Sequence, residues 1–264
     1  MRHKYLTVEI KPTLAATDDG LNAPFSDGDV LFDWTAFVVP LGGKLIGAHV
    51  EIRPKGDSGS TPNIFPLELI FNTHKQDNTT GTIFAPPKTL GPLNAAPANP
   101  TTITSSTDMF IGQVPILAGD FFTGHDSLAL ASTSDTNGIV FMNKEDFNTR
   151  QVTGTNGHTE NKFFVAGIAG GAFNFVSSTL IDNGDLDGPV MTIDGTDPRL
   201  HIAIGDTVAV CDTTATGDSL AMGIVEGLTS EAITLTQAFT TTDVANNDIV
   251  YNVNPIRILL TIEY

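Results

Sequence analysis

Apolar and polar residues alternate in many short stretches of this chain, which is the pattern of half-buried β-strands. In residues 44–52, after Gly42 and Gly43, every second position from Ile46 onward is apolar. Further strands, separated by turn-forming residues and bent at glycines in the last case, are expected at 5–10, 30–39, 66–71, 109–116, 127–131, 138–142 and 162–176. The pattern therefore predicts an all-β protein.

The first and last strands of the chain resemble each other. Residues 5–10 and 256–264 are both apolar stretches interleaved with Thr and Glu, so we expect them in one sheet system. In the last strand one face would carry Ile256, Ile258, Leu260 and Ile262. We predict an antiparallel, jelly-roll-like β-sandwich closed by the N- and C-terminal strands, built from residues 1–177 and 254–264.

The composition changes near residue 178. From there to the last residue the chain has two basic side chains against thirteen acidic ones. Short strand patterns with Gly, Asp and Thr turns follow one another at 190–193, 205–210, 220–225, 232–236 and 248–253. Five or six such strands in about seventy residues are typical of a small barrel. Residues 180–252 are thus predicted to be an acidic β-barrel domain inserted before the last strand.

Charge and cysteine usage narrow the function classes. With a net charge of −17 and no basic run beyond residues 2–4, the chain is not expected to bind nucleic acid. No apolar run is long enough to cross a bilayer, and no secretory signal pattern follows Met1, so we expect neither membrane insertion nor export. Cys211 is the only cysteine, which excludes an intrachain disulfide, and alternation at 208–212 predicts that its side chain is buried.

One acidic cluster has the composition of a calcium loop. Closely spaced carboxylates around glycines at 182–188 would supply the oxygen ligands that Ca²⁺ prefers. The candidate metal ligands are Asn183, Asp185, Asp187 and Asp194. Asn in the opening position, Asp in place of the closing Glu, and Pro189 all depart from the EF-hand order. The alternative is a turn between two domains. No other cofactor is expected.

No catalytic constellation is evident, and we predict that the protein is not an enzyme. Residues 167–171 lack the strand, helix and Lys of a phosphate loop, and the six histidines are scattered. His125 precedes an Asp and a Ser, but neighbouring side chains point apart. Trp34 is expected to anchor the core. Sugar stacking at Trp34, or a polysaccharide-degrading activity, would need partner aromatics, which are few in this chain.

Residues 84–100 are rich in proline, which favours an ordered surface arm or a long loop. Loops of that length usually contact something. Leu90 and Leu93 are therefore candidate interface residues, because prolines limit the freedom that the loop would lose on docking. The alternative is that the loop packs on its own sandwich.

Several strands resemble those of one class of tailed-phage virion structural protein, in particular the β-sandwich capsid-decoration (head-associated) proteins. The resemblance rests on four stretches: 42–52, 65–72, 110–116 and 256–264. It covers about half of the chain, and the acidic segment 180–252 departs from it. The resemblance implies a location in the virion, synthesis in the host cytoplasm, and partners such as the major capsid protein.

Taken together, these observations predict an oligomeric capsid-decoration or cement protein that stabilises a phage head through inter-subunit contacts. The main alternative is a tail-fibre or baseplate adhesin that binds glycans of the host surface. That alternative predicts exposed aromatic side chains on the acidic barrel.

Overall fold

The computed structural model describes most of the chain and shows an all-β protein. The described residues are 4–14, 23–39, 42–73, 87, 89–97, 110–122, 128–142, 162–182, 186–211, 219–241 and 244–264. Among them no helix has both the length and the apolar character needed to span a membrane.

The elements follow one another as short strands with two single-turn 3-10 helices. In chain order they are β1 (Tyr5–Ile10), β2 (Val30–Val38), β3 (Gly43–Ile52), β4 (Leu67–Asn72), β5 (Phe110–Ile116), η2 (Ala118–Asp120), β6 (Phe121–Phe122), β7 (Ala129–Thr133), β8 (Val140–Phe141), β9 (Lys162–Ala169), β10 (Thr179–Ile181), β11 (Leu186–Gly195), η3 (Pro198–Leu200), β12 (Thr207–Cys211), β13 (Ser219–Leu228), β14 (Ala232–Thr241), β15 (Ile249–Asn252) and β16 (Ile256–Glu263).

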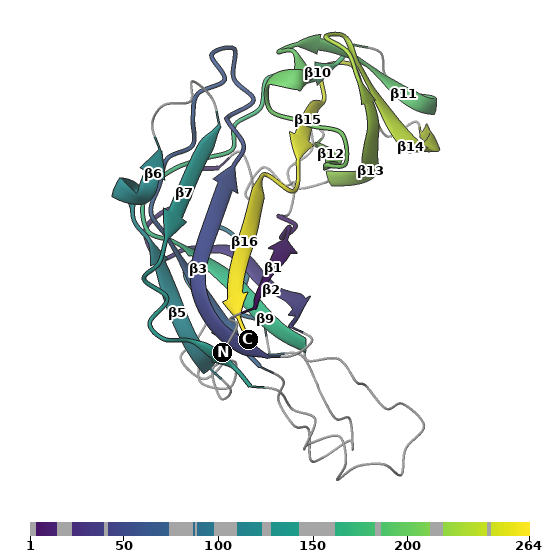
Figure 1. Ribbon diagram of the computed structural model, residues 1–264. Coiled ribbons are helices and arrows are strands. Elements are labelled where there is room, and N and C mark those ends of the chain that lie inside the picture. Colours follow the sequence, from purple (N-terminus) through teal and green to yellow (C-terminus); the bar gives the residue numbers. More distant parts are fainter. Residues whose placement is uncertain are drawn as a thin grey trace, which may run out of the picture.

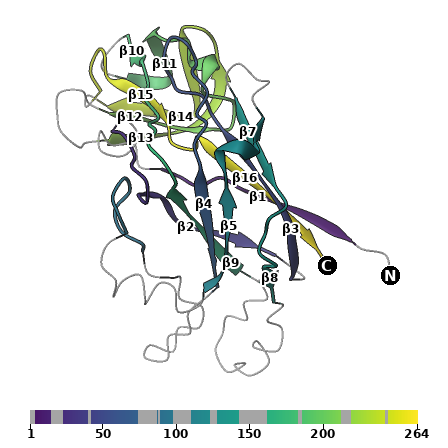
Figure 2. The same cartoon turned by 90° about the vertical axis from the view of Figure 1, so that its left-hand side faces the viewer.

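Two antiparallel sheets form the sandwich (Figures 1 and 2). The first sheet has the order β1-β16-β3-β7-β6, with β8 also paired to β3, and the second has the order β2-β9-β4-β5. The strands at the two ends of the chain lie side by side, with Tyr5 opposite Glu263. This confirms that the first and last strands belong to one sheet.

Strand β16 is central to the first sheet because it pairs with β1 on one side and β3 on the other. Its side chains alternate between buried and half-buried, as its sequence predicts. The four apolar residues of the inner face have 0% of their surface exposed: Ile256, Ile258, Leu260 and Ile262. They pack into a core in which phenylalanine is the most prominent aromatic residue.

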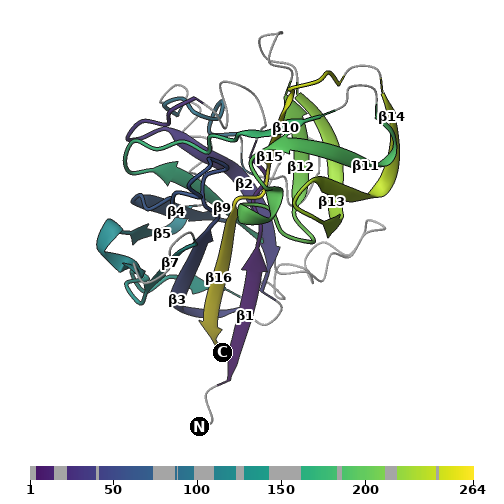
Figure 3. The same ribbon diagram turned by 90° about the horizontal axis from the view of Figure 1, so that it is seen from above.

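The other six strands close into a barrel with the order β10-β11-β14-β13-β12-β15 (Figure 3). Its interior is filled by aliphatic side chains with no aromatic among them: Ile181, Met191, Ile193, Ile202, Val208, Val210, Val225, Ile233, Leu235, Val244 and Val250. The small barrel predicted from the sequence is therefore confirmed. That the barrel and the sandwich fold as separate domains, with a boundary near residues 178 and 253, remains a prediction.

The barrel packs on the sandwich through two strands that are buried on both faces. Val208 and Val250 point into the barrel, whereas Cys211 and Tyr251 belong to the core of the sandwich. Cys211 is 2% exposed, which confirms that it is a small core side chain. The Leu14 amide donates to the Val253 carbonyl across this seam at 2.8 Å.

A row of charged side chains also connects the two parts. On the outer face of the first sheet, Arg257 contacts Glu9 at 2.6 Å and Glu51 at 3.4 Å. Glu51 in turn contacts Arg53 at 3.4 Å, and Arg53 reaches the carboxylate of Asp206 in the barrel at 3.5 Å. Asp206 is 3% exposed, so this last pair is screened less by water than the others.

A buried histidine lies at the same seam. The Thr179 hydroxyl donates its single hydrogen to the Thr196 carbonyl, so Nε2 of His201 is the donor in its 2.8 Å contact with Thr179 Oγ1. The other side of the ring faces Gly56, where an added Cβ would lie 2.8 Å from His201 Cε1. Burial lowers the pKa of His201 to about 4, against the opposing pull of the Asp197 and Asp57 carboxylates.

Candidate functional site

The proline-rich arm covers one edge of the sandwich. Strand β2 is the last strand of its sheet, and an uncovered edge would leave backbone groups unpaired. The Asn94 amide donates to the Val30 carbonyl, and the Val30 amide donates to the Ala95 carbonyl, both at 2.9 Å. The described part of the arm, at residue 87 and residues 89–97, thus pairs with the first residue of β2 and also contacts the side chain of Asp33.

Leu90, a candidate interface residue, is buried. Its side chain is 2% exposed and packs with Val30 and Ala166 in a small cluster of its own. Apolar packing on β2 removes this side chain from water, as the alternative of a loop packed on its own sandwich expects, and a role of Leu90 in an interface stays an untested prediction. Leu93 is half-buried against the same cluster, and its role in an interface remains a prediction.

A β-bulge on β2 changes where Asp33 and Trp34 point. Phe32 lies opposite Gly167 and Thr35 lies opposite Val165, so β2 has one extra residue in this interval. Alternation is lost there, and the residues from Asp33 to Thr35 are all half-buried. Trp34 consequently contacts the small Leu90 cluster and lies outside the main core. The expectation that Trp34 anchors the core of the sandwich is wrong.

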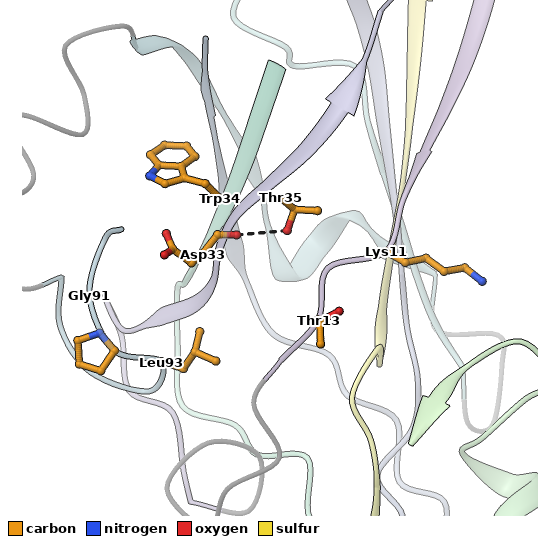
Figure 4. A pocket seen from close by; sticks show the side chains of 8 residues that line it. Lys11, Thr13, Asp33, Trp34, Thr35, Gly91 and Leu93 are labelled. Carbon is orange, nitrogen blue, oxygen red and sulfur yellow. Dashed lines mark hydrogen bonds between the residues drawn. The ribbon is translucent and has the colours of Figure 1, made fainter. Parts of the chain in front are cut away.

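The bulge and the arm together form an open pocket of about 540 Å³ (Figure 4). Figure 4 shows Asp33 and Trp34 projecting from β2 toward the arm, whereas the side chain of Lys11 extends away from the other residues. The lining residues are Lys11, Thr13, Asp33, Trp34, Thr35, Gly91, Pro92 and Leu93.

Hydrogen bonds hold the polar wall of this pocket in place. Oδ1 of Asp33 accepts a bond from the Leu90 amide at 3.1 Å, which ties the carboxylate to the arm. The Thr35 hydroxyl donates to the Asp33 carbonyl at 3.2 Å. The wall therefore combines an oriented carboxylate and a hydroxyl with the indole of Trp34.

A second candidate surface lies at the opposite edge of the sandwich, where β5 and β6 are the outermost strands of their sheets (Figure 1). We define the apolar edge as the large exposed apolar residues on or beside β5, β6 and β8: Phe110, Leu117, Phe122, Val140 and Met142. The most exposed are Met142 at 71%, Phe122 at 61% and Leu117 at 59%. These side chains fall into two groups: Phe122 lies beside Leu130 of β7, toward the Ile52 end of β3, whereas Val140 of β8 pairs with Lys44 at the other end of β3. Exposed apolar side chains that gather on a surface are typical of interaction sites.

The turn that carries two of these side chains is well held. The Leu117 amide donates to Asp120 Oδ2 at 2.8 Å, and the Asp120 amide donates back to the Leu117 carbonyl at 3.0 Å. Phe122 follows at once and pairs with Leu130 of β7. Leu117 and Phe122 are thus presented by a short, hydrogen-bonded connection between the two sheets.

The calcium prediction is only partly within the described structure. Asn183 and Asp185 lie outside the described residues, as does the side chain of Asp187. Asp194 is exposed on β11, and its Oδ1 accepts a bond from the following Gly195 amide. In the part of the chain that the structure describes, no three His, Cys, Asp or Glu side chains gather into a metal-binding group. The calcium site stays a prediction.

The adhesin alternative predicts exposed aromatic side chains on the barrel, and the structure describes part of its aromatic content. Residues 179–252 contain two aromatic side chains, Phe239 and Tyr251. Tyr251 is 1% exposed and faces the seam, so it presents no surface for sugar stacking. The side chain of Phe239 lies outside the described residues.

Sequence reasoning missed the apolar edge and the Trp34 pocket. The dipeptide Phe121-Phe122 was a usable signal, because neighbouring residues in a strand face opposite sides and one ring had to point outward. The pocket had no such signal, since a bulge in β2 and an arm from a remote part of the sequence create it.

Comparison with known protein families and with curated proteins finds no match for this chain.

Proposed function

We propose that this protein is a structural component of a phage particle, which decorates the capsid and binds its subunits through the apolar edge. The observation that carries the proposal is the exposure of Leu117 and Phe122, the apolar side chains of the apolar edge that lie beside β5 and on β6, the outermost strands. Such side chains contribute binding free energy when a partner removes them from water.

The form of the edge supports assembly. Strand edges can pair with another chain through backbone hydrogen bonds, and exposed apolar side chains beside them add packing. A standard interface buries about 1,600 Å², so Leu117 and Phe122 would form the centre of one contact and polar neighbours its rim.

The charge of the chain is consistent with a protein that must stay soluble before it assembles. A net charge of −17 makes free copies repel one another. The proposed partners are the major capsid protein and further copies of this chain around a capsomer. Stable association would then need short-range apolar contact, which the apolar edge offers.

The test removes two anchors from the apolar edge and measures association with the particle. Replacing Leu117 and Phe122 together by Ser should weaken binding to undecorated capsids by about 2–4 kcal/mol. Co-sedimentation with purified capsids measures the binding. The melting temperature of the free protein should change little, because both side chains are mostly in water.

A matched control removes two exposed isoleucines from the barrel, Ile204 and Ile224. This variant should bind capsids as the unchanged protein does. Equal co-sedimentation of all three proteins would exclude the apolar edge as the interface. Absence of the protein from imaged, purified particles would refute the virion location itself.

A further inference from the structure

We infer that the Trp34 pocket is a binding site for a neutral saccharide. This goes beyond a decorating function, because it gives the sandwich a ligand site on the edge opposite to the proposed capsid contact. The argument rests on how the pocket is built, which groups line it, and what charge it carries.

Packing within the fold holds both walls of the pocket in place. The β2 bulge turns Asp33 and Trp34 outward, and the register that produces it also places Gly167 under the ring of Phe32, where an added Cβ would lie 2.2 Å from that ring. The opposite wall is the arm, held by the burial of Leu90. Both walls are thus fixed by packing, and a preformed site loses little entropy on binding.

The lining has the two kinds of group that a sugar ring requires. The half-buried indole of Trp34 offers an aromatic surface for the C–H groups of a pyranose. Beside it, Asp33 Oδ1 is held by the Leu90 amide, which leaves the carboxylate further acceptor capacity for sugar hydroxyls. Thr13 adds a hydroxyl that can donate, because its oxygen accepts from Asn254. Thr35 adds an acceptor, because its hydrogen goes to the Asp33 carbonyl.

Charge selects a neutral ligand. Asp33 places a carboxylate at the pocket, and the whole chain has a net charge of −17, which opposes phosphorylated or acidic ligands. Lys11 does not offset this, because its ammonium lies 3.9 Å from Glu9 and its side chain extends away from the pocket (Figure 4).

Size agrees with a sugar of one or two rings. The volume of about 540 Å³ falls within the roughly 300–1,000 Å³ of typical small-molecule pockets. The pocket is also open to solvent, so a longer glycan could extend beyond it.

The chain provides its own reporter for the test. Trp34 is the only tryptophan, so its fluorescence reports on this pocket alone. The full-length protein should be titrated with glucose, N-acetylglucosamine, maltose and cellobiose at up to millimolar concentrations. We expect a saturable change in emission with at least one of these sugars and none with glucose-6-phosphate.

The decisive variant is Asp33→Asn. An asparagine oxygen can still accept the Leu90 amide, so the wall should stay in place while the charge and one acceptor are lost. We expect at least about tenfold weaker binding of the best sugar, which corresponds to about 1.4 kcal/mol. Asp135→Asn, an exposed carboxylate on the β7–β8 connection, is the matched control and should bind normally.

Two outcomes would overturn the inference. One is the absence of any saturable sugar-dependent change in the unchanged protein. The other is equal affinity in the Asp33→Asn variant, which would mean that any response comes from elsewhere. Capsid binding by the same variants is expected to be normal, so failure here leaves the decorating function untouched.

Discussion

The sandwich and the barrel differ in whether their outermost strands have unpaired edges. The barrel closes on itself, so its six strands leave no open edge. The sandwich has four outermost strands, β1, β2, β5 and β6. The arm covers β2, whereas β5 and β6 carry exposed apolar side chains.

The two parts also differ in the side chains that fill their interiors and in their net charge. Nine buried phenylalanines belong to the core cluster of the sandwich, whereas the described side chains of the barrel interior include no aromatic ring. Residues 179–252 have one basic side chain against twelve acidic ones, a net charge of −11 that leaves only −6 for the rest of the chain. The comparison teaches that binding surfaces are expected on the sandwich, while the barrel is closed and strongly acidic and is expected to fold by itself.

The largest expected effect comes from removing β16 by truncation after Asn254. Four fully buried side chains would be lost, worth roughly 6–12 kcal/mol at about 1.5–3 kcal/mol each. This equals the whole stability of a typical domain, so the sandwich should not fold. Trp34 fluorescence should show no cooperative unfolding, while hydrogen exchange should still protect β13 and β14.

Two other outcomes of the truncation would contradict the comparison between the barrel and the sandwich. If protection of β13 and β14 is also lost, the barrel depends on the sandwich and is not self-contained. If Trp34 still unfolds cooperatively, β16 is dispensable to the sandwich.

A smaller effect is expected from Leu90→Ala, which tests whether the arm is part of the sandwich. Because Leu90 is buried, the free energy of unfolding should fall by about 2–5 kcal/mol. Leu93→Ala is the control and should cost clearly less, since Leu93 is half-buried. Denaturant unfolding monitored by Trp34 measures both. A Leu90 variant of unchanged stability but impaired capsid binding would restore the arm as the interface.

The smallest effect is a pH dependence at the seam. His201 has a folded pKa of about 4, below the roughly 6.5 of an unfolded histidine, so the unfolded state binds more protons between these values. The stabilisation is fully present above about pH 6.5 and is lost as the pH falls toward 4. Between about pH 7 and pH 5 the loss should be about 2 kcal/mol.

His201→Gln is the comparison, because its amide can still donate to the Thr179 hydroxyl but does not titrate in this range. Melts of both proteins across this pH range should show the gap between them narrowing toward pH 5. A constant gap would mean that protonation of His201 does not weaken the seam.

The regular elements could be predicted from the sequence because their signals are local. Alternation marked β3, β5 and β16, and the five strand patterns between 190 and 253 matched β11 to β15. The features that form the candidate sites depend on distant contacts instead. Leu90 is an apolar residue among prolines, and only the pairing of residues 94 and 95 with Val30 shows that it faces inward. Trp34 was misplaced because an added residue in β2 alters the alternation without a local mark.

The neighbouring positions of β10 and β15 have a consequence for how the chain folds. Glu51 and Arg257 lie 206 residues apart in sequence, yet β3 and β16 must pair for the first sheet to form. Leu180 pairs with Ile249, so a folded barrel brings its two ends together and shortens that search to roughly 140 residues. The entropy saved is only about 0.4 kcal/mol. The greater effect is on the order of events, because contacts within the barrel are far more local than the β3–β16 pairing and form sooner. We therefore expect the last strand to reach its place beside β3 from a barrel that is already folded.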